Sequence, residues 1–267
     1  MISRFACRFA LYTFSVNKGL ALSISCNKNL EALPRKQLYC TMEQKQPDSC
    51  SLLERLREEK KLLRKEIRSQ LKKLSPEEFS SQSARVWLKL FELPHYKAAK
   101  SVGMFMSMPS GEIHTSEALE RMLLHDKKIL YVPRVGLNFE HCEMSLVKVD
   151  VPVQETTNSS FFENWQRNKW NIPEPPGTVE AGPGDIDVLV VPGCAFDVQG
   201  NRIGQGKGYY DRFISRRRLN GKPILIAVGL EPQLLAADNL VPTHEHDIPM
   251  DVLVFPHSTI FVNSCVG

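Results

Sequence analysis

The stretch "DIDVLVVPGCAFDVQGNRIGQGKGYYDRF", Asp185–Phe213, decides the fold class because it passes through three patterns in succession. It begins with a short apolar run rich in Val, which predicts a buried β-strand. A glycine-rich loop follows the strand, and a basic helix is predicted from Tyr209 to Leu219. A strand, a loop and a helix in this order are typical of an α/β protein.

The loop holds Gly200, Gly204, Gly206 and Gly208 within nine residues. Glycine accepts positive φ angles and lets backbone N–H groups approach a bulky anion, and the start of the next helix adds a partial positive charge. The pattern therefore favours a phosphate ligand close to Lys207. Its spacing differs from the GxxxxGK[ST] and GxGxxG nucleotide patterns, so a plain glycine-rich turn is the alternative.

Strand and helix patterns alternate along the rest of the chain. Helices are predicted over Ser51–Leu74, from the capping residue Ser75 toward Phe91, and over about Thr115–His125. Further strands are predicted at "SVGMFM", "KKILYVPRV", "HCEMSLVKV", "PILIAVGL" and "DVLVFP". This alternation predicts one domain over residues 51–267. We expect a three-layer α/β fold: an open, largely parallel sheet with helices on both faces.

Ligands of open parallel sheets bind outside the carboxyl ends of the strands. The loops after Met106 and Pro192 are therefore the places where we expect a site. The long irregular segment Asp150–Gly184 fits this fold best as a binding loop, because structureless loops of that length are uncommon in compact domains.

The net charge of the chain belongs to its first 50 residues. The whole chain carries +4, and residues 1–50 hold seven Lys or Arg against three Asp or Glu, so residues 51–267 are neutral. This distribution gives no electrostatic support to a nucleic-acid partner. The basic run Arg216–Arg218 is expected to be a solvated helix face.

Residues 1–50 have the composition of an organelle transit peptide. Basic residues alternate with apolar residues and serines, and no acidic residue precedes Glu31. We predict a mitochondrial leader over residues 1–50, with a plastid leader or a disordered tail on a cytoplasmic protein as alternatives; Lys18 disfavours a secretory signal. No apolar run reaches the roughly 18 residues that span a bilayer. We expect no membrane partner and a monomer.

The seven cysteines are scattered without CxxC spacing, which predicts neither a disulfide framework nor a zinc site and fits a reducing compartment. His244, Glu245 and His246 place two imidazoles at i and i+2. Zinc is disfavoured there because no third soft ligand accompanies them.

Two cations of the first predicted helix lean toward its apolar side. A step of about 100° per residue places Lys60 between Ile67 and Leu71, and Arg64 at the edge of the apolar stripe. An anion held against the helix explains these positions. Snorkelling, in which long side chains cover apolar surface while their charges reach water, explains them as well.

The segment "VVPGCAFDVQGNRIGQGKGYYDRF" resembles the 5-formyltetrahydrofolate cyclo-ligases, also called methenyltetrahydrofolate synthetases. The weaker matches "KKLLRKEI", "FMSMPSGEIHT" and "WNIPEP" occur in the order of that family, so the resemblance runs from about Lys60 to Val254. It implies an enzyme that uses ATP and magnesium to close the 5-formyl group of a reduced folate onto N10. The products would be 5,10-methenyltetrahydrofolate, ADP and phosphate.

The implied chemistry explains why no Ser/His/Asp triad is expected. The γ-phosphoryl group moves onto the formyl oxygen, N10 attacks the activated carbon, and phosphate departs. Such phosphoryl transfer depends on positioning and charge neutralisation more than on a protein nucleophile.

Carried over residue by residue, the resemblance implies three groups of site residues. ATP binding falls on Lys60, Arg64, Arg202, Ile203, Gly204, Gln205, Gly206, Lys207, Gly208, Tyr209 and Tyr210. Arg202, Lys207 and Tyr210 are the expected catalytic residues within that group. Folate binding falls on Met106, Glu112, Trp170, Gln205, Gly206, Lys207, Gly208 and Tyr209. Magnesium falls on Asp211 and Asp247, since hard carboxylate oxygens suit a hard cation.

The residue types on the folate side agree with this assignment. The Glu112 carboxylate can accept two parallel N–H bonds from a pterin edge, Met106 and Met108 can pack against the ring, and Trp170 can stack on it. Without the resemblance, Glu112 would be a surface glutamate, the methionines ordinary core residues, and the two loop tyrosines aromatics at a helix start.

Gln205 departs from the family pattern, in which the loop commonly has the sequence "GRGKGYYD". One phosphate contact is therefore expected to be weaker here, or to be replaced by Arg202 or Arg212. Two rival functions stay open: a catalytically silent relative that binds folate or RNA, and a sugar-phosphate or coenzyme A enzyme on a similar scaffold. Retention of Lys207, Tyr210 and Asp211 argues against the silent relative.

Overall fold

The computed structural model describes residues 49–135, 143–150, 161–162, 164–217 and 223–262. Residues 1–48 of the predicted leader, the cysteines Cys142 and Cys265, and the predicted helix end at Leu219 lie outside the described residues. None of the helices within the described ranges is long and apolar enough to cross a membrane.

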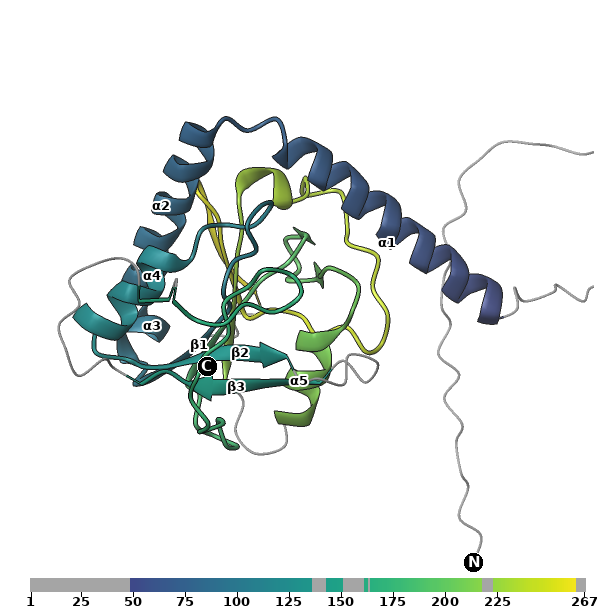
Figure 1. Cartoon of the computed structure of the whole chain (residues 1–267). Helices are drawn as coiled ribbons and strands as arrows, with labels where there is room; N and C mark the ends of the chain where they lie inside the picture. Colours follow the sequence, from purple (N-terminus) through teal and green to yellow (C-terminus); the bar gives the residue numbers. More distant parts are fainter. Residues whose placement is uncertain (1–48, 136–142, 151–160, 163, 218–222, 263–267) are drawn as a thin grey trace, which may run out of the picture. The chain divides into compact units, whose positions relative to one another are not determined.

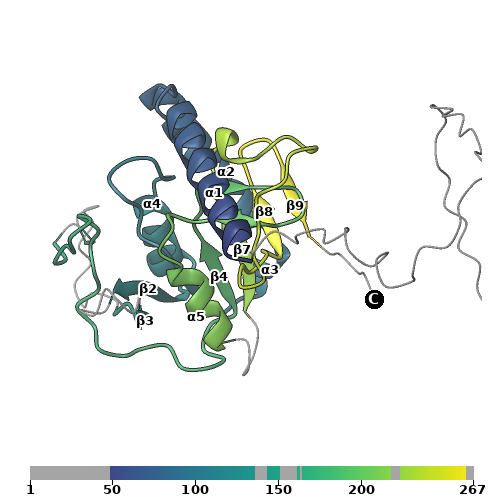
Figure 2. The ribbon, with the colours of Figure 1, turned by 90° about the vertical axis from the view of Figure 1, so that its right-hand side faces the viewer.

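A seven-stranded sheet forms the middle layer of the described chain (Figures 1 and 2). Its strands are β1 (Ser101–Met104), β2 (Ile129–Val135), β3 (Met144–Lys148), β4 (Val188–Val191), β7 (Ile224–Val228), β8 (Val252–Val254) and β9 (Thr259–Phe261). The order across the sheet is β3-β2-β1-β4-β7-β8-β9, with parallel pairing from β2 to β8 and antiparallel edges at β3 and β9. The predicted open, largely parallel sheet is confirmed.

Helices cover both faces of this sheet. They are α1 (Ser49–Leu71), α2 (Pro76–Glu92), α3 (Pro94–Ala98), α4 (Ser116–Glu120), the π-helical turn η1 (Arg121–His125), α5 (Tyr209–Arg217) and the 3-10 turn η3 (Glu231–Gln233). Figure 1 shows α2, α3 and α4 beside one another, with α5 across the strands from them. Buried side chains of α1 to α4 belong to one core cluster, whereas Phe213 and Ile214 of α5 belong to the other. The predicted three layers are therefore present.

The central strands alternate between the two core clusters. In β4, Val188 and Val190 pack in the cluster under α1 to α4, whereas Leu189 and Val191 pack in the cluster under α5. This alternation follows from the two-residue period of a strand, and burial on both sides explains why the run is apolar throughout. In β1, a Cβ at Gly103 would lie 2.8 Å from Leu189 Cδ1, so the sheet has no room for a side chain there.

The helix boundaries differ from the sequence expectation in two places. The first helix was expected to reach Leu74, but it ends at Leu71 and a turn leads to the next helix. There Ser75 forms a capping box: the Glu78 N–H donates to Ser75 Oγ (3.2 Å) and the Ser75 N–H donates to Glu78 Oε2 (3.0 Å). The helix predicted to end at His125 changes from α to π after Glu120.

Several short elements were not predicted. They are α3, η3, β9 and a two-stranded hairpin formed by β5 (Ala195–Phe196) and β6 (Arg202–Ile203). Strands of two or three residues hold little more than one period of the two-residue strand pattern, which is too short for the alternation to be recognised in the sequence.

The described end of the long segment Asp150–Gly184 is tied to the sheet. The Lys148 N–H donates to the Val179 carbonyl (2.8 Å), and the Ala181 N–H donates to the Leu146 carbonyl (2.7 Å). Residues 179–181 therefore run along β3. At the carboxyl end of β2 the Val135 N–H donates to Glu174 Oε1 (3.1 Å), which holds this part of the segment near that end of the sheet.

Candidate active site

A cavity of about 710 Å³ lies at the carboxyl ends of β1, β2 and β4. Phe105 and Met106, which follow β1, and Pro192 and Gly193, which follow β4, all line it. Strand order reverses between β1 and β4, and ligands of open α/β sheets bind at such a reversal. The expectation of a site at the loops after Met106 and Pro192 agrees with this location.

Every residue predicted to bind ATP, folate or magnesium lines this one cavity. They are Lys60, Arg64, Met106, Glu112, Trp170, Arg202, Ile203, Gly204, Gln205, Gly206, Lys207, Gly208, Tyr209, Tyr210, Asp211 and Asp247. Their shared location puts them within reach of the same ligands. Their individual roles stay predictions.

The cavity also has lining residues that the sequence analysis did not name individually as site residues. They are Arg57, Phe105, Pro133, Val135, Met144, Asn168, Ile172, Pro192 and Gly193. Arg57 had a usable signal, because it lies three residues before Lys60 on the same helix. Pro133 and Met144 had none, since only the sheet order brings the ends of β2 and β3 beside β1.

The glycine loop owes its conformation to its residue type. Gly206 has a φ of +100° and Gly208 a φ of +71°, values that residues with a Cβ rarely adopt. The loop leads straight into α5, whose first turn begins at Tyr209, and the Arg212 N–H donates back to the Gly208 carbonyl (3.1 Å). The exposed side chain of Lys207 thus lies between two glycines at a helix N-terminus.

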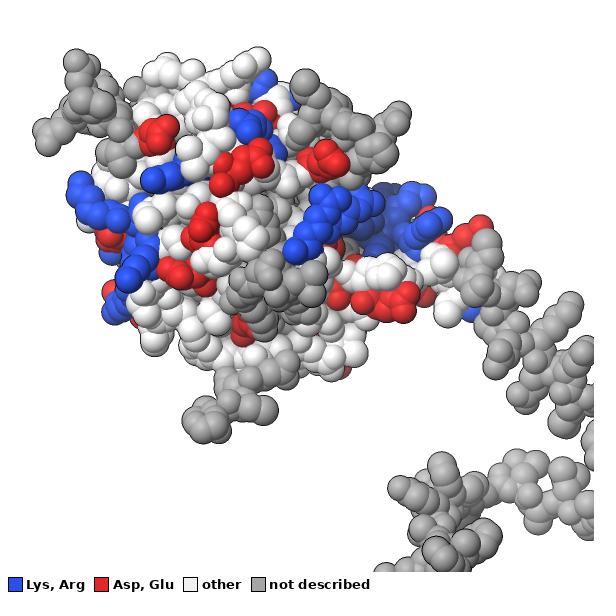
Figure 3. All heavy atoms as spheres, turned by 90° about the horizontal axis from the view of Figure 1, so that it is seen from below, with Lys and Arg blue, Asp and Glu red and all other residues white. Residues whose placement is uncertain are grey.

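Cations of α1 face this loop. Arg64 Nε donates to the Gly204 carbonyl (2.8 Å), and a Cβ at Gly206 would lie 3.5 Å from Arg64 Cζ. Lys60 forms an ion pair with Asp247, and its side chain is 14% exposed. Burial lowers the pKa of the Arg64 guanidinium. Seen from below, basic side chains gather on the α1 side of the molecule (Figure 3).

The predicted lean of the α1 cations is confirmed. Lys60 and Arg64 are half-buried, whereas Lys61 and Lys65 are exposed. Snorkelling alone does not describe Lys60 and Arg64, because the charged ends contact Asp247 and the loop backbone.

Arg202 is the most buried cation of the cavity. Its side chain is 3% exposed; one terminal nitrogen donates to Asp211 Oδ1 (2.7 Å) and the other lies 3.4 Å from the Pro192 carbonyl. Its Nε has no hydrogen-bond partner among the described residues. A buried guanidinium with a donor to spare is costly in a core and useful beside an anionic ligand.

Glu112 is a buried carboxylate in the loop that follows β1. It is 8% exposed, and its Oε2 accepts the Met108 N–H (3.0 Å). Its Oε1 lies 3.5 Å from Gln205 Nε2, the outer limit of a hydrogen bond. No Lys, Arg or His among the described residues forms an ion pair with it. The low exposure of Glu112 rules out the surface position considered above. Burial also raises the pKa of its carboxyl group.

Aromatic and apolar side chains line the same cavity as this carboxylate. The Trp170 and Tyr209 rings lie edge to face with centroids 6.1 Å apart, and Lys169 Nζ is 4.5 Å from the Trp170 ring centroid. Met106 belongs to the core and to the cavity wall at once. Tyr210 packs against both core clusters, and burial raises the pKa of its hydroxyl, which stays protonated at neutral pH.

Comparison with known proteins identifies the family. A model of the 5-formyltetrahydrofolate cyclo-ligase family matches residues 56–256. The chain is 30% identical over 205 residues to 5-formyltetrahydrofolate cyclo-ligase of Mus musculus, covering 74% of this chain and 94% of the mouse chain. This chain belongs to the 5-formyltetrahydrofolate cyclo-ligase family.

Two further relatives agree with this assignment to the cyclo-ligases. The mitochondrial 5-formyltetrahydrofolate cyclo-ligase of Arabidopsis thaliana is 29% identical over 229 residues, which is 78% of each chain. The solved structure of 5,10-methenyltetrahydrofolate synthetase from Aquifex aeolicus matches with a TM-score of 0.59 at 30% identity, covering 77% of this chain and 93% of that one. The chain is accordingly a ligase, as the resemblance implied.

In this cyclo-ligase the side chain of Gln205 contacts a cation that the sequence analysis did not consider. The guanidinium that contacts Gln205 belongs to Arg68 of α1, whose terminal nitrogen donates to Gln205 Oε1 (2.5 Å). Arg202 is instead bound to Asp211, and Arg212 lies 3.3 Å from the Lys207 carbonyl. Sequence inspection did not single out Arg68, although it follows Arg64 by one helical turn.

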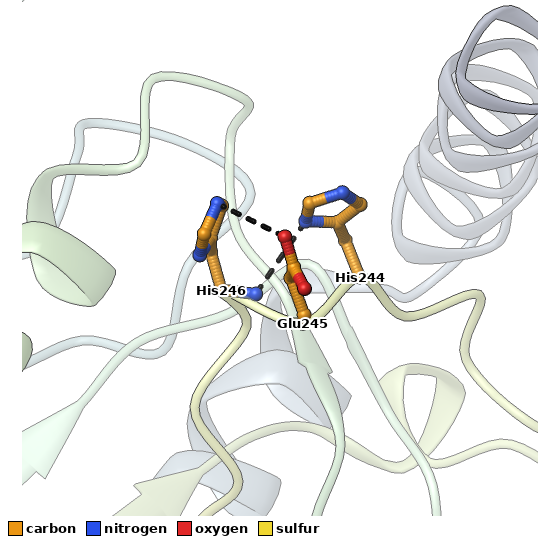
Figure 4. Close-up of side chains that lie close together, drawn as sticks. All are labelled: His244, Glu245 and His246. Carbon is orange, nitrogen blue, oxygen red and sulfur yellow. Dashed lines mark hydrogen bonds and ion pairs between the residues drawn. The ribbon is translucent and has the colours of Figure 1, made fainter. Parts of the chain in front are cut away.

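The histidine cluster of this cyclo-ligase lies next to the cavity residue Asp247. Figure 4 shows the Glu245 carboxylate between the imidazoles of His244 and His246, and the three side chains offer ligand atoms within 4.8 Å of one another. Glu245 and His246 are exposed, with side-chain exposures of 76% and 80%. The third ligand atom that this cluster offers is a carboxylate oxygen, and the expectation against zinc stays a prediction.

Proposed function

We propose that the cavity at the carboxyl ends of β1, β2 and β4 is where this chain converts 5-formyltetrahydrofolate and ATP into 5,10-methenyltetrahydrofolate, ADP and phosphate. One observation carries the proposal: a single cavity holds a glycine loop with Lys207, two cations of α1 and a buried carboxylate that has no ion-pair partner among the described residues. The first two suit a triphosphate, and the third suits the N–H edge of a pterin.

The triphosphate binds between α1 and the glycine loop. Lys60 and Arg64 supply charge from the helix, and the positive φ angles of Gly206 and Gly208 turn loop N–H groups toward the phosphates. Lys207 neutralises the phosphoryl group in transit. Because this side chain is exposed and flanked by glycines, it follows the group from ATP to the formyl oxygen.

Reduced folate binds on the Glu112 side of the same cavity. The Glu112 carboxylate accepts N–H bonds from the amino-pyrimidinone edge, Met106 packs against the ring, and Trp170 stacks on the pterin or aminobenzoyl part. The protonated Tyr210 hydroxyl donates a hydrogen bond to the oxygen on which charge develops. Arg202 stabilises the same charge by placing its guanidinium in the cavity wall.

The reaction then balances without a protein nucleophile. The formyl oxygen takes the γ-phosphoryl group from ATP, which breaks the bond to ADP and activates the formyl carbon. N10 forms the new carbon–nitrogen bond and loses its proton, and the formyl oxygen leaves as part of inorganic phosphate. Positioning of the two substrates by one cavity supplies most of the acceleration.

The carboxylates present fit a magnesium ion. Asp211 uses only Oδ1 for Arg202, and Asp247 uses only Oδ2 for Lys60 and the His244 N–H, so within the described residues each has an oxygen to offer. Hard carboxylate oxygens are the ligands that Mg²⁺ prefers. We propose that Asp211 and Asp247 hold the ion, which when bound neutralises phosphate charge.

We propose that the protein acts in mitochondria as a monomer. The support for the location is the basic, acid-poor composition of residues 1–50 and a mitochondrial relative in Arabidopsis thaliana. Fusion of residues 1–50 to a fluorescent protein tests the location: uniform cytosolic fluorescence would contradict it.

The test of the reaction uses the purified full chain with ATP, MgCl₂ and 5-formyltetrahydrofolate labelled with ¹⁸O in the formyl group. We expect methenyl-folate absorbance to rise only with hydrolysable ATP, and the released phosphate to carry the ¹⁸O. A folded protein that forms no product contradicts the activity. Product formation with unlabelled phosphate contradicts transfer to the formyl oxygen while leaving the activity intact.

A further inference from the structure

Arg68 is a cation of α1 that contacts a lining residue of the cavity but is not among the described lining residues itself. Arg57, Lys60, Arg64 and Arg68 follow one another at spacings of three or four residues, so they form one stripe along the helix. The first three line the cavity, whereas Arg68 is not among its described lining residues. Its guanidinium instead contacts Gln205, which does line the cavity.

The Gln205 amide lies between a donor and an acceptor. Its Oε1 accepts from Arg68 (2.5 Å), and its Nε2 faces Glu112 Oε1 (3.5 Å). A flipped amide would set its NH₂ against the guanidinium, donor to donor, and its oxygen against the carboxylate. Arg68 and Glu112 together therefore fix which end of the amide points into the cavity.

Successive turns of α1 hold different parts of the loop. Arg64 binds the backbone at the Gly204 carbonyl (2.8 Å), whereas Arg68 binds the side chain of the next residue. Gln205 lies between two glycines, and besides Arg68 and Glu112 its amide is contacted by the Cys194 thiol, which lies 3.9 Å from Oε1. Losing Arg68 would leave the loop backbone held and release only the amide.

The positive charge of Arg68 also stabilises the Glu112 carboxylate through the Gln205 amide. This buried carboxylate has no ion-pair partner among the described residues, and its Oε1 is contacted only by the long Gln205 bond. A guanidinium bound to the oxygen of an amide polarises the N–H groups of that amide. The positive charge of Arg68 therefore strengthens the hydrogen bond that the Gln205 N–H donates to Glu112. A direct Arg–Glu pair would instead occupy the carboxylate.

We propose that Arg68 is a positioning residue that acts through Gln205 on Glu112, and so sets how tightly the site holds reduced folate. The inference rests on the proposed role of Glu112 in folate binding. Arg68 touches neither substrate in this scheme. Because Arg68 and Gln205 are exposed, the contribution is that of one ordinary hydrogen bond and not of a buried ion pair.

The first test is Arg68→Met, which removes the donors and keeps most of the stem, measured in the full chain. We expect the KM for 5-formyltetrahydrofolate, and its Kd measured by calorimetry without ATP, to rise about fivefold, the scale of one hydrogen bond. The kcat and the KM for ATP should stay within about twofold. Arg68→Lys, which keeps charge and one donor, should recover part of the loss.

Lys65→Met is the matched control, because it removes an exposed cation that lies one helical turn before Arg68 in α1 and is not among the described lining residues of the cavity. Melting temperatures of all variants check the fold. If Lys65→Met weakens folate binding as much as Arg68→Met, only the helix charge matters and the proposal fails. A rise in the KM for ATP alone would make Arg68 a nucleotide contact and would also overturn it.

A double-mutant cycle tests whether Arg68 acts through Glu112. In the Glu112→Gln background, Arg68→Met should weaken folate binding by less than about twofold, because its target is gone. Independent losses that multiply would refute the coupling. If instead Glu112→Gln has no effect on folate binding, the proposed function of Glu112 has failed. An active wild type with additive losses means that only the present inference has failed.

Discussion

Among the described residues, the cavity carboxylates near α1 and the glycine loop are each bound to a cation, whereas the carboxylate that follows β1 is not. Asp247 pairs with Lys60 and Asp211 with Arg202; we call this part the charged half. Glu112, in what we call the Glu112 half, accepts only the N–H groups of Met108 and Gln205 within the described part of the chain.

The difference indicates which ligand each half suits. Paired charges suit a polyanion with its metal ion. The cations can release their carboxylates and bind phosphates, and the carboxylates can then bind Mg²⁺. A buried, unpaired carboxylate suits a neutral ligand with N–H donors, because a hydrogen-bonded edge removes the cost of burying the charge. In the proposed function the charged half therefore binds ATP and the Glu112 half binds folate.

The largest expected effect comes from the loop cation of the charged half. Lys207→Ala should lower kcat about 10²- to 10³-fold, the scale of losing one preorganised group that stabilises developing charge. Steady-state kinetics with saturating ATP and folate measure it, with the exposed Lys65→Ala as control. A kcat close to that of the wild type would remove Lys207 from the mechanism.

Reciprocal variants test the division between the halves. Glu112→Gln should raise the KM for folate about 10- to 100-fold and leave the KM for ATP within about twofold, since one charge-assisted contact is lost. Arg64→Met should raise the KM for ATP about tenfold with little change for folate. Equal losses for both substrates in either variant would show that the halves are not separate.

The smallest effect concerns stability, and its sign follows from the pKa of Glu112. Burial raises this pKa in the folded protein, so the neutral carboxyl is favoured by folding and the stability it gives is lost as pH rises through the raised pKa. Glu112→Gln, which stays neutral, should therefore melt slightly above the wild type at pH 7 and match it near pH 4.

Thermal unfolding of the two proteins across this pH range measures the difference. Asp211→Asn is a useful contrast, since it removes a carboxylate that has a cation partner and should destabilise at pH 7 by leaving Arg202 buried and unpaired. A Glu112→Gln protein less stable than the wild type at pH 7 would contradict the unpaired burial of Glu112.

Much of the charged half was predictable from the sequence. Gly206 and Gly208 adopt positive φ angles, which glycine-rich sequences indicate because glycine has no Cβ. The positions of Lys60 and Arg64 toward the buried side follow from a step of about 100° per residue. The resemblance to the cyclo-ligases then placed Asp211 and Asp247 in the same site, and both line the cavity. Their roles with magnesium stay predictions.

The Glu112 half was less predictable from the sequence. Glu112 has no local sign of burial, since it follows "PSG", a typical exposed turn, and only packing against the core makes it 8% exposed. Pro133 and Met144 enter the cavity because β2 and β3 lie beside β1 in the sheet order. The hairpin of β5 and β6 is too short to leave a periodic pattern.

The sequence by itself determined the layers of this protein and the loop chemistry, because strand period, helix period and glycine φ are properties of a few neighbouring residues. Only the tertiary structure decided which charges meet. Lys60 and Asp247 are 187 residues apart, Arg68 and Gln205 are 137 apart, and Gln205 and Glu112 are 93 apart. Such partners are chosen by the packing of α1 and two loops at one edge of the sheet, and no local pattern records that choice.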